Sequence, residues 1–208
     1  MNNIKRTSIS LGTLGDSHVG KSALTEIYLG REFSEEYIST IGINANIKDD
    51  KITIKGEEKK IKIKIWDTAG QEKYKSIATS YIKTCNGIFL IYAINDRKSF
   101  ENIEEWLKEV EEKKNTNNKV PLVLIGNKID LENERVVSKD EGKKLAQKFN
   151  LEFFECSAKN NCNVSKAFHC LIKMVFLVYQ NEFDTSDQSI FNIDDEPDKS
   201  TVCCKKKQ

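Results

Sequence analysis

The sequence predicts an α/β domain with a mostly parallel, six-stranded sheet flanked by helices. Short apolar segments of strand length alternate along the chain with longer segments whose apolar residues recur at helical spacing. Strands that alternate with helices are joined by right-handed crossovers, which make neighbouring strands parallel. A glycine-rich turn at residues 15–22 joins the first strand-like segment to the first helix-like one. Open sheets of this class bind ligands at the carboxyl ends of their strands, where this turn is expected.

The individual elements follow from local pattern. Apolar or alternating segments predict strands at Thr7–Leu14, Ile47–Ile54, Ile61–Trp66, Gly87–Ile94, Val120–Ile125 and Leu151–Cys156. Helical spacing predicts helices at Lys21–Leu29, Ser99–Lys114, Lys139–Phe149 and Val164–Tyr179. The second and third strands are expected to form a hairpin that turns near Gly56. In the third strand, buried isoleucines should alternate with solvated lysines. Ser138 is the expected N-cap of the helix that follows it.

Composition excludes several classes of protein. The 33 Lys and Arg residues and the 32 Asp and Glu residues give a net charge of +1, which argues against a protein that coats nucleic acid. The first residues form no apolar leader, and the longest apolar run, residues 87–94, is too short to span a bilayer. The six cysteines include no C-x₂-C pair, so no zinc site is expected. In a reducing cytosol, Cys85, Cys156 and Cys170 should fill core gaps as small hydrophobes.

The turn at residues 15–22 fits the phosphate-loop pattern G-x-x-x-x-G-K-[ST]. Glycines let successive backbone N–H groups point at phosphate oxygens, and the helix that follows adds the partial positive charge of its N-terminus. A glycine-rich turn alone is also an ordinary strand-to-helix loop, but the full pattern predicts nucleotide binding. Lys21 would contact the outer phosphates, and the Ser22 hydroxyl would ligate Mg²⁺. The expected binding residues are Gly15, Asp16, Ser17, His18, Val19, Gly20, Lys21 and Ser22.

A second motif, Asp67-Thr68-Ala69-Gly70-Gln71, leaves the end of an apolar strand. A carboxylate at Asp67 would emerge beside the phosphate loop and hold Mg²⁺, usually through water, because Mg²⁺ gives up its hydration reluctantly. The Gly70 N–H could reach a terminal phosphate. Gln71 could orient a water molecule for in-line attack. In isolation this segment is also compatible with an ordinary turn at a strand end.

A third motif, Asn127-Lys128-Ile129-Asp130, predicts which base of the nucleotide is bound. The Asp130 carboxylate can accept two hydrogen bonds from the ring N–H and the exocyclic amine of guanine, whereas adenine would leave it unpaired. Asn127 is expected to tie this loop to the phosphate loop, and the Lys128 stem to lie along the base. A fourth element after a strand would add backbone donors to the guanine carbonyl, and it consists of Ser157, Ala158 and Lys159.

With these four motifs in this order, the chain resembles a small GTPase of the Ras superfamily, and most closely the Rab family, over residues 7 to about 180. The resemblance implies a GTPase domain at residues 1–180 and a flexible tail at 181–208. It implies that Phe33 packs against guanine, that Tyr37 covers the phosphates, and that Thr40 ligates Mg²⁺ and senses the γ-phosphate. Residues 33–45 and 67–83 would form two switches, held in place by GTP and Mg²⁺ and released on hydrolysis.

The carboxyl-terminal end favours the Rab family. Cys203 and Cys204 are adjacent, and Lys205 stands where a C-a-a-X box would need its cysteine. In Rab proteins such a pair carries two geranylgeranyl groups, and two lipids hold a protein on a membrane where one does so only marginally. The resemblance thus implies lipidation and a place on the cytosolic face of an internal membrane. The alternative is a pair of incidental cysteines on a polar, acidic end.

The resemblance also implies an activity and a set of partners. The activity is GTP hydrolysis by an in-line water positioned by Gln71 and stabilised by Lys21 and Mg²⁺, slow until a partner supplies an arginine. The partners are guanine nucleotide, an exchange factor, a GTPase-activating protein, a GDP-dissociation inhibitor and effectors that contact the switches. The protein would act as a monomer without nucleic acid, as a switch in vesicle traffic.

Three departures from the family pattern stand out. His18 occupies a loop position where relatives carry glycine or a small residue. Asn44 and Ala45 replace an acid and a phenylalanine of the first switch, which reduces a partner-binding aromatic triad to Trp66 and Tyr81. The hairpin also looks longer than usual. Two alternatives therefore stand beside the traffic switch: a GTP-bound scaffold whose hydrolysis is impaired by His18, and a soluble small GTPase outside the Rab family.

Overall fold

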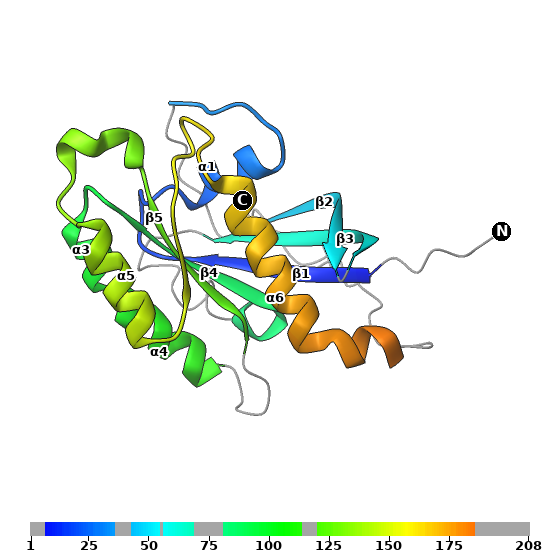
Figure 1. Ribbon diagram of the computed structural model, residues 1–208. Helices are drawn as coiled ribbons and strands as arrows, with labels where there is room; N and C mark the ends of the chain where they lie inside the picture. Colours follow the sequence, from blue (N-terminus) through cyan, green and yellow to red (C-terminus); the bar gives the residue numbers. More distant parts are fainter. Residues whose placement is uncertain (1–6, 36–42, 55, 69–80, 114–119, 186–208) are drawn as a thin grey trace, which may run out of the picture.

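A computed structural model describes residues 7–35, 43–54, 56–68, 81–113 and 120–185 (Figure 1). These residues form a six-stranded sheet in the order β2-β3-β1-β4-β5-β6. Only the β2–β3 pair is antiparallel, and all the other neighbours run parallel. The predicted α/β class is confirmed. The strands are β1 (Thr7–Leu14), β2 (Ile43–Ile54), β3 (Glu57–Thr68), β4 (Gly87–Ala93), β5 (Leu122–Asn127) and β6 (Glu152–Glu155).

Helices cover both faces of the sheet. The α-helices are α1 (Lys21–Tyr28), α3 (Arg97–Glu101), α4 (Ile103–Lys113), α5 (Lys139–Lys148) and α6 (Val164–Thr185), with short 3₁₀ turns η2 (Tyr81–Thr84) and η3 (Ile129–Glu134). One core lies between the sheet and the helices α1 and α6, and α6 crosses the front of the sheet in Figure 1. The other core lies between the sheet and α4 and α5. No helix among the described residues is both long enough and apolar enough to cross a membrane.

The helix α6 buries the residues that its spacing predicted. Val164, Ala167, Phe168, Leu171, Ile172 and Val175 are each no more than 1% exposed. The apolar stripe contacts the central strands, so its burial fixes the helix across the sheet. The helix continues to Thr185, past residue 180, where the domain was expected to end. Helix α5 begins at the expected cap, because Ser138 accepts a hydrogen bond from the Glu141 N–H and the Glu141 carboxylate accepts one from the Ser138 N–H.

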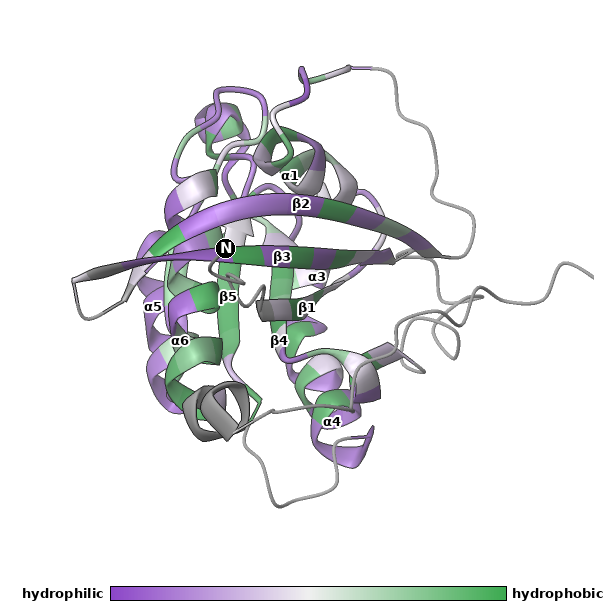
Figure 2. Cartoon of the chain, turned by 90° about the vertical axis from the view of Figure 1, so that its right-hand side faces the viewer, coloured by the Kyte–Doolittle hydropathy of each residue, from purple (hydrophilic) through white to green (hydrophobic). Residues whose placement is uncertain are grey.

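The β2–β3 hairpin turns where it was expected but is longer than its apolar pattern indicated. Gly56 has a positive φ of 85° at the turn, and Ile54 pairs with Glu57. Polar residues extend both strands, because backbone pairing rather than side-chain alternation sets their length. Ile61, Ile63 and Ile65 are buried while the lysines between them are partly exposed, as predicted. In Figure 2, β2 at the sheet edge is largely hydrophilic, whereas β4 and β5 are hydrophobic.

Three other expectations need correction. The helix predicted at Ser99–Lys114 starts earlier, since Asp96 caps it, and it divides at Asn102 into α3 and α4. Strand β5 begins at Leu122 rather than Val120, because Pro121 has no N–H to donate to a neighbouring strand. Cys85 and Cys156 are buried as expected, but Cys170 is only partly buried.

Candidate nucleotide-binding site

The phosphate loop leaves the carboxyl end of β1 and leads directly into α1. Gly15 and Gly20 both have a positive φ, of 145° and 92°. A Cβ atom at Gly15 would collide with the Ile91 carbonyl oxygen, and one at Gly20 with the Asn127 side-chain amide. Glycine is therefore required at both places by backbone conformation and by space. His18 lies between them with a φ of 63°, a left-handed conformation that histidine tolerates better than most residues.

Lys21 is folded back over this loop. Its Nζ donates hydrogen bonds to the carbonyl oxygens of Gly15, at 3.1 Å, and Asp16, at 2.6 Å. The residue is only 5% exposed. Burial lowers the pKa of Lys21 to about 8, although the charges of Asp67 and Asp16 oppose that shift. A buried ammonium at the start of a helix that donates hydrogen bonds to neutral carbonyl oxygens is poised to bind an anion.

Asp67 stands beside Lys21, near the end of β3. The residue is 3% exposed, and its carboxylate accepts hydrogen bonds from the hydroxyls of Ser22 and Thr13. Burial raises the pKa of Asp67, and the hydrogen bonds and the Lys21 charge only partly offset this. A carboxylate and a hydroxyl brought together in a buried site are the hard oxygen donors that Mg²⁺ prefers. Ser22 and Asp67 thus fit a magnesium ion.

The guanine motif is joined to the rest of the site by two contacts. The Asn127 side-chain amide donates a hydrogen bond to the Val19 carbonyl oxygen at 2.8 Å, which is the link to the phosphate loop expected from the sequence. The Ser157 hydroxyl donates to the Asp130 carboxylate at 2.5 Å. Lys128 has a positive φ of 70°, and burial lowers its pKa. The loops after β1, β5 and β6 therefore meet at one edge of the sheet.

The remaining predicted site residues range from buried to exposed, or lie outside the described part of the chain. Ala158 is buried, Lys159 is exposed, and Phe33 is 36% exposed after α1. Ser17 is partly exposed within the phosphate loop. Several predicted residues lie outside the described part of the chain: Tyr37, Thr40, Gly70, Gln71, Cys203 and Cys204.

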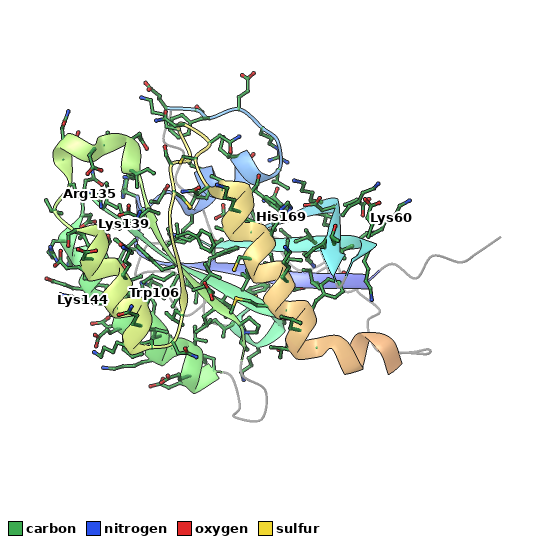
Figure 3. All side chains as sticks on the ribbon, in the orientation of Figure 1. Lys60, Trp106, Arg135, Lys139, Lys144 and His169 are labelled. Carbon is green, nitrogen blue, oxygen red and sulfur yellow. The ribbon has the colours of Figure 1, made fainter. Side chains whose placement is uncertain are left out.

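One part of the site was missed by the sequence analysis. The Asp16 carboxylate accepts hydrogen bonds from the Asn102 side-chain amide, at 2.6 Å, and from Trp106 Nε1, at 2.9 Å. Trp106, labelled in Figure 3, projects from α4. Asn102 and Trp106 are four residues apart and so share one helical face. The sequence shows these two side-chain donors on an otherwise apolar face. The spacing of residues does not indicate which acceptor they contact.

Comparison with known proteins assigns the chain to a family. The Ras family model matches residues 11–177. Ras-related protein Rab-13 of Bos taurus is 45% identical over 164 residues, which cover 79% of this chain and 78% of the relative. The chain belongs to the Ras family as a Rab GTPase. GTP-binding protein ypt2 of Schizosaccharomyces pombe is 41% identical over 185 residues, 88% of this chain and 90% of that protein. Ras-related protein Rab-10 of Diplobatis ommata is 46% identical over 155 residues, 74% of each chain.

Family membership settles the coarse function. As a Rab GTPase, the protein is a GTP-binding and GTP-hydrolysing switch that acts in vesicle traffic. The alternative of a small GTPase outside the Rab family is not favoured by these relatives. The loops after β1, β5 and β6 carry the first, third and fourth sequence motifs, and Asp67 of the second motif lies near the end of β3.

Proposed function

We propose that the loops gathered at the carboxyl edge of the sheet bind GTP with Mg²⁺ and hydrolyse it, with the residue roles given below. One observation carries the proposal. Side-chain hydrogen bonds join elements that are distant in sequence at this edge. They run from Asn127 to Val19, from Ser157 to Asp130, and from Thr13 and Ser22 to Asp67. A phosphate-binding loop, a pair of oxygen donors for a metal and a carboxylate for guanine therefore belong to one site.

Each side chain then has a distinct task. Lys21 exchanges its carbonyl partners for phosphate oxygens, and the anion restores the ionised state that burial disfavours. Ser22, Thr40 and Asp67 hold Mg²⁺, which would supply charge neutralisation on the β- and γ-phosphates. Asp130 selects guanine while Asn127 keeps the base loop against the phosphate loop. Gly70 contacts the γ-phosphate, and Gln71 orients the attacking water.

Single-turnover hydrolysis tests these roles. With Mg²⁺, the purified protein should hydrolyse bound GTP slowly, and Gln71→Leu should slow it further by at least about tenfold, because the water loses its orienting group. GTP affinity should stay within about threefold, since Gln71 is assigned no ground-state contact. Hydrolysis by the Gln71→Leu variant at the wild-type rate would remove Gln71 from the mechanism.

His18 gives one specific reason to consider an impaired enzyme. It places an imidazole in the phosphate loop in a left-handed conformation. The variant His18→Gly in the same assay separates the two functions. Turnover that is absent in the wild type and appears in His18→Gly would favour a GTP-bound scaffold. Similar slow rates in both proteins would favour the cycling switch.

We further propose that Cys203 and Cys204 carry two lipids and anchor the protein to the cytosolic face of an internal membrane. The support is the adjacent pair at a polar end and the physical need for two lipids in stable anchoring. Mass spectrometry of the protein from its native cell should show both cysteines modified. Unmodified cysteines in the membrane-bound fraction would refute this anchor.

The partner surface is expected to differ from that of other Rab proteins. Ala45 is exposed and pairs with Trp66 across β2 and β3, and the Trp66 and Tyr81 rings lie 4.6 Å apart. A methyl group thus stands where a third aromatic ring would extend this patch. Purified effector domains of Rab relatives should bind Ala45→Phe more tightly than the wild type, by about threefold or more. Thr53→Phe, at the far end of the same face, is the control and should not gain affinity.

A further inference from the structure

An ion pair joins the two loops that lie on the guanine side of the site. Lys159 Nζ is 2.8 Å from Glu35 Oε1, although the two residues are separated by 124 positions in the chain. Glu35 belongs to the segment after α1, and Lys159 to the loop before α6. Both loops lie together at the top of Figure 1. The contact is exposed, with the two side chains 50% and 78% accessible, so it can open and close without disturbing a core.

Each partner is close in sequence to residues with assigned roles. Glu35 follows Phe33, which is expected to pack against guanine, and it directly precedes residues 36–42, which include Tyr37 and Thr40. Lys159 follows Ser157, whose hydroxyl contacts Asp130. A bond between these side chains therefore connects the start of the first switch to the loop that recognises the base.

Both groups are charged in this arrangement. The hydrogen bond from Lys159 lowers the pKa of Glu35, and the same hydrogen bond raises the pKa of Lys159. The charge of Asp130 also raises the pKa of Lys159, so this ammonium lies in the field of two carboxylates. The pair is thus ionised throughout the neutral range and responds to salt rather than to pH.

We propose that the Glu35–Lys159 ion pair is a strap across the guanine side of the nucleotide site that slows nucleotide release. Glu35 acts as a positioning residue through Lys159, and a factor that displaces the first switch must separate the two. The inference rests on guanine-nucleotide binding at this site. An exposed ion pair contributes modestly, so the expected effect is about two- to fivefold in the dissociation rate.

Release of fluorescent GDP from the full-length, Mg²⁺-loaded protein tests the strap. At about 0.05 M salt, Glu35→Gln should release nucleotide about two- to fivefold faster than wild type. At about 1 M salt the two rates should converge, because screening removes the pair from the wild type as well. Glu104→Gln breaks a similar exposed pair with Lys148, 2.7 Å long and between α4 and α5, and should leave the release rate unchanged.

Charge reversal separates the pair from other roles of its members. Lys159→Glu should speed release, and adding Glu35→Lys to it should slow release again, because the ion pair is rebuilt with opposite polarity. The melting temperature of the nucleotide-free protein should stay the same in Glu35→Gln, which a purely structural role would not predict. A wild-type release rate in Glu35→Gln at low salt, or additive effects in the double variant, would overturn the strap. Failure of the wild type to hold GDP would instead refute nucleotide binding.

Discussion

Replacing Asp130 by asparagine should weaken the binding of GDP and GTP by roughly 10³–10⁴-fold, because a site built to hydrogen-bond a particular group of its ligand discriminates at that level. The carboxylate can accept both guanine donors at once. An amide at the same place offers one acceptor and turns a donor toward a donor of the base, which leaves two groups unpaired. Competition with fluorescent GDP measures the loss directly.

The same substitution should leave the fold nearly intact. An asparagine oxygen can still accept the hydrogen bond from the Ser157 hydroxyl, so the contact between the two loops survives. The melting temperature of the nucleotide-free variant should therefore match the wild type. ATP should not gain affinity, because adenine lacks the donor pair. Guanine binding that persists in Asp130→Asn within about threefold would show that another group selects the base.

Replacing Lys21 by methionine should weaken GTP binding by roughly 10²–10³-fold, since charge-assisted bonds to phosphate contribute about 1.5–3 kcal/mol each. The nucleotide-free protein should respond differently. In that state the Lys21 charge is buried, and methionine removes the cost of desolvating it while keeping a side chain of similar length. The Lys21→Met variant should thus lose affinity for GTP without a matching loss in the free energy of unfolding of the nucleotide-free protein.

The free energy of unfolding should depend on pH because Lys21 titrates differently in the folded and unfolded protein. Its folded pKa of about 8 lies below its ordinary value of 10.5. Between these values the unfolded chain holds the proton more tightly, so stability rises with pH in that window. Below about pH 8 the full penalty of the buried charge applies, of order 3 kcal/mol. Above 10.5 the penalty is gone.

Urea unfolding of the nucleotide-free protein at two pH values on either side of this window measures the effect. The difference between wild type and Lys21→Met should shrink or change sign as the pH rises, because only the wild type gains stability from Lys21 deprotonation. The control is Lys144→Met, which removes the charge of an exposed lysine on α5. Its free energy of unfolding should change with pH as that of the wild type does. Parallel curves for wild type and Lys21→Met would contradict a buried, depressed lysine.

The class of fold and the loops of the site were predictable from local sequence. Glycines with a positive φ at residues 15 and 20, a lysine and serine at the helix start, and apolar strands that alternate with helices depend mainly on neighbouring residues. Because parallel strands present their carboxyl ends at one edge, the order of motifs along the chain also predicted which loops would meet.

Other features depended on contacts between distant segments. The division of the predicted helix at Asn102 and the partners of Asp16 follow from where α3 and α4 pack. Residues 43–46 belong to β2, ahead of the predicted apolar segment, because β3 offers them backbone partners.

The chemical groups of this site and the edge of the sheet on which they gather can be predicted from the order of residues along the chain. How those groups are solvated and paired depends on the folded arrangement. The raised pKa of Asp67 and the bond between Glu35 and Lys159 depend on residues far along the chain. The depressed pKa of Lys21 depends on burial in the folded protein. Desolvation and ion pairing depend on distances in space, and no local pattern of residues encodes those distances.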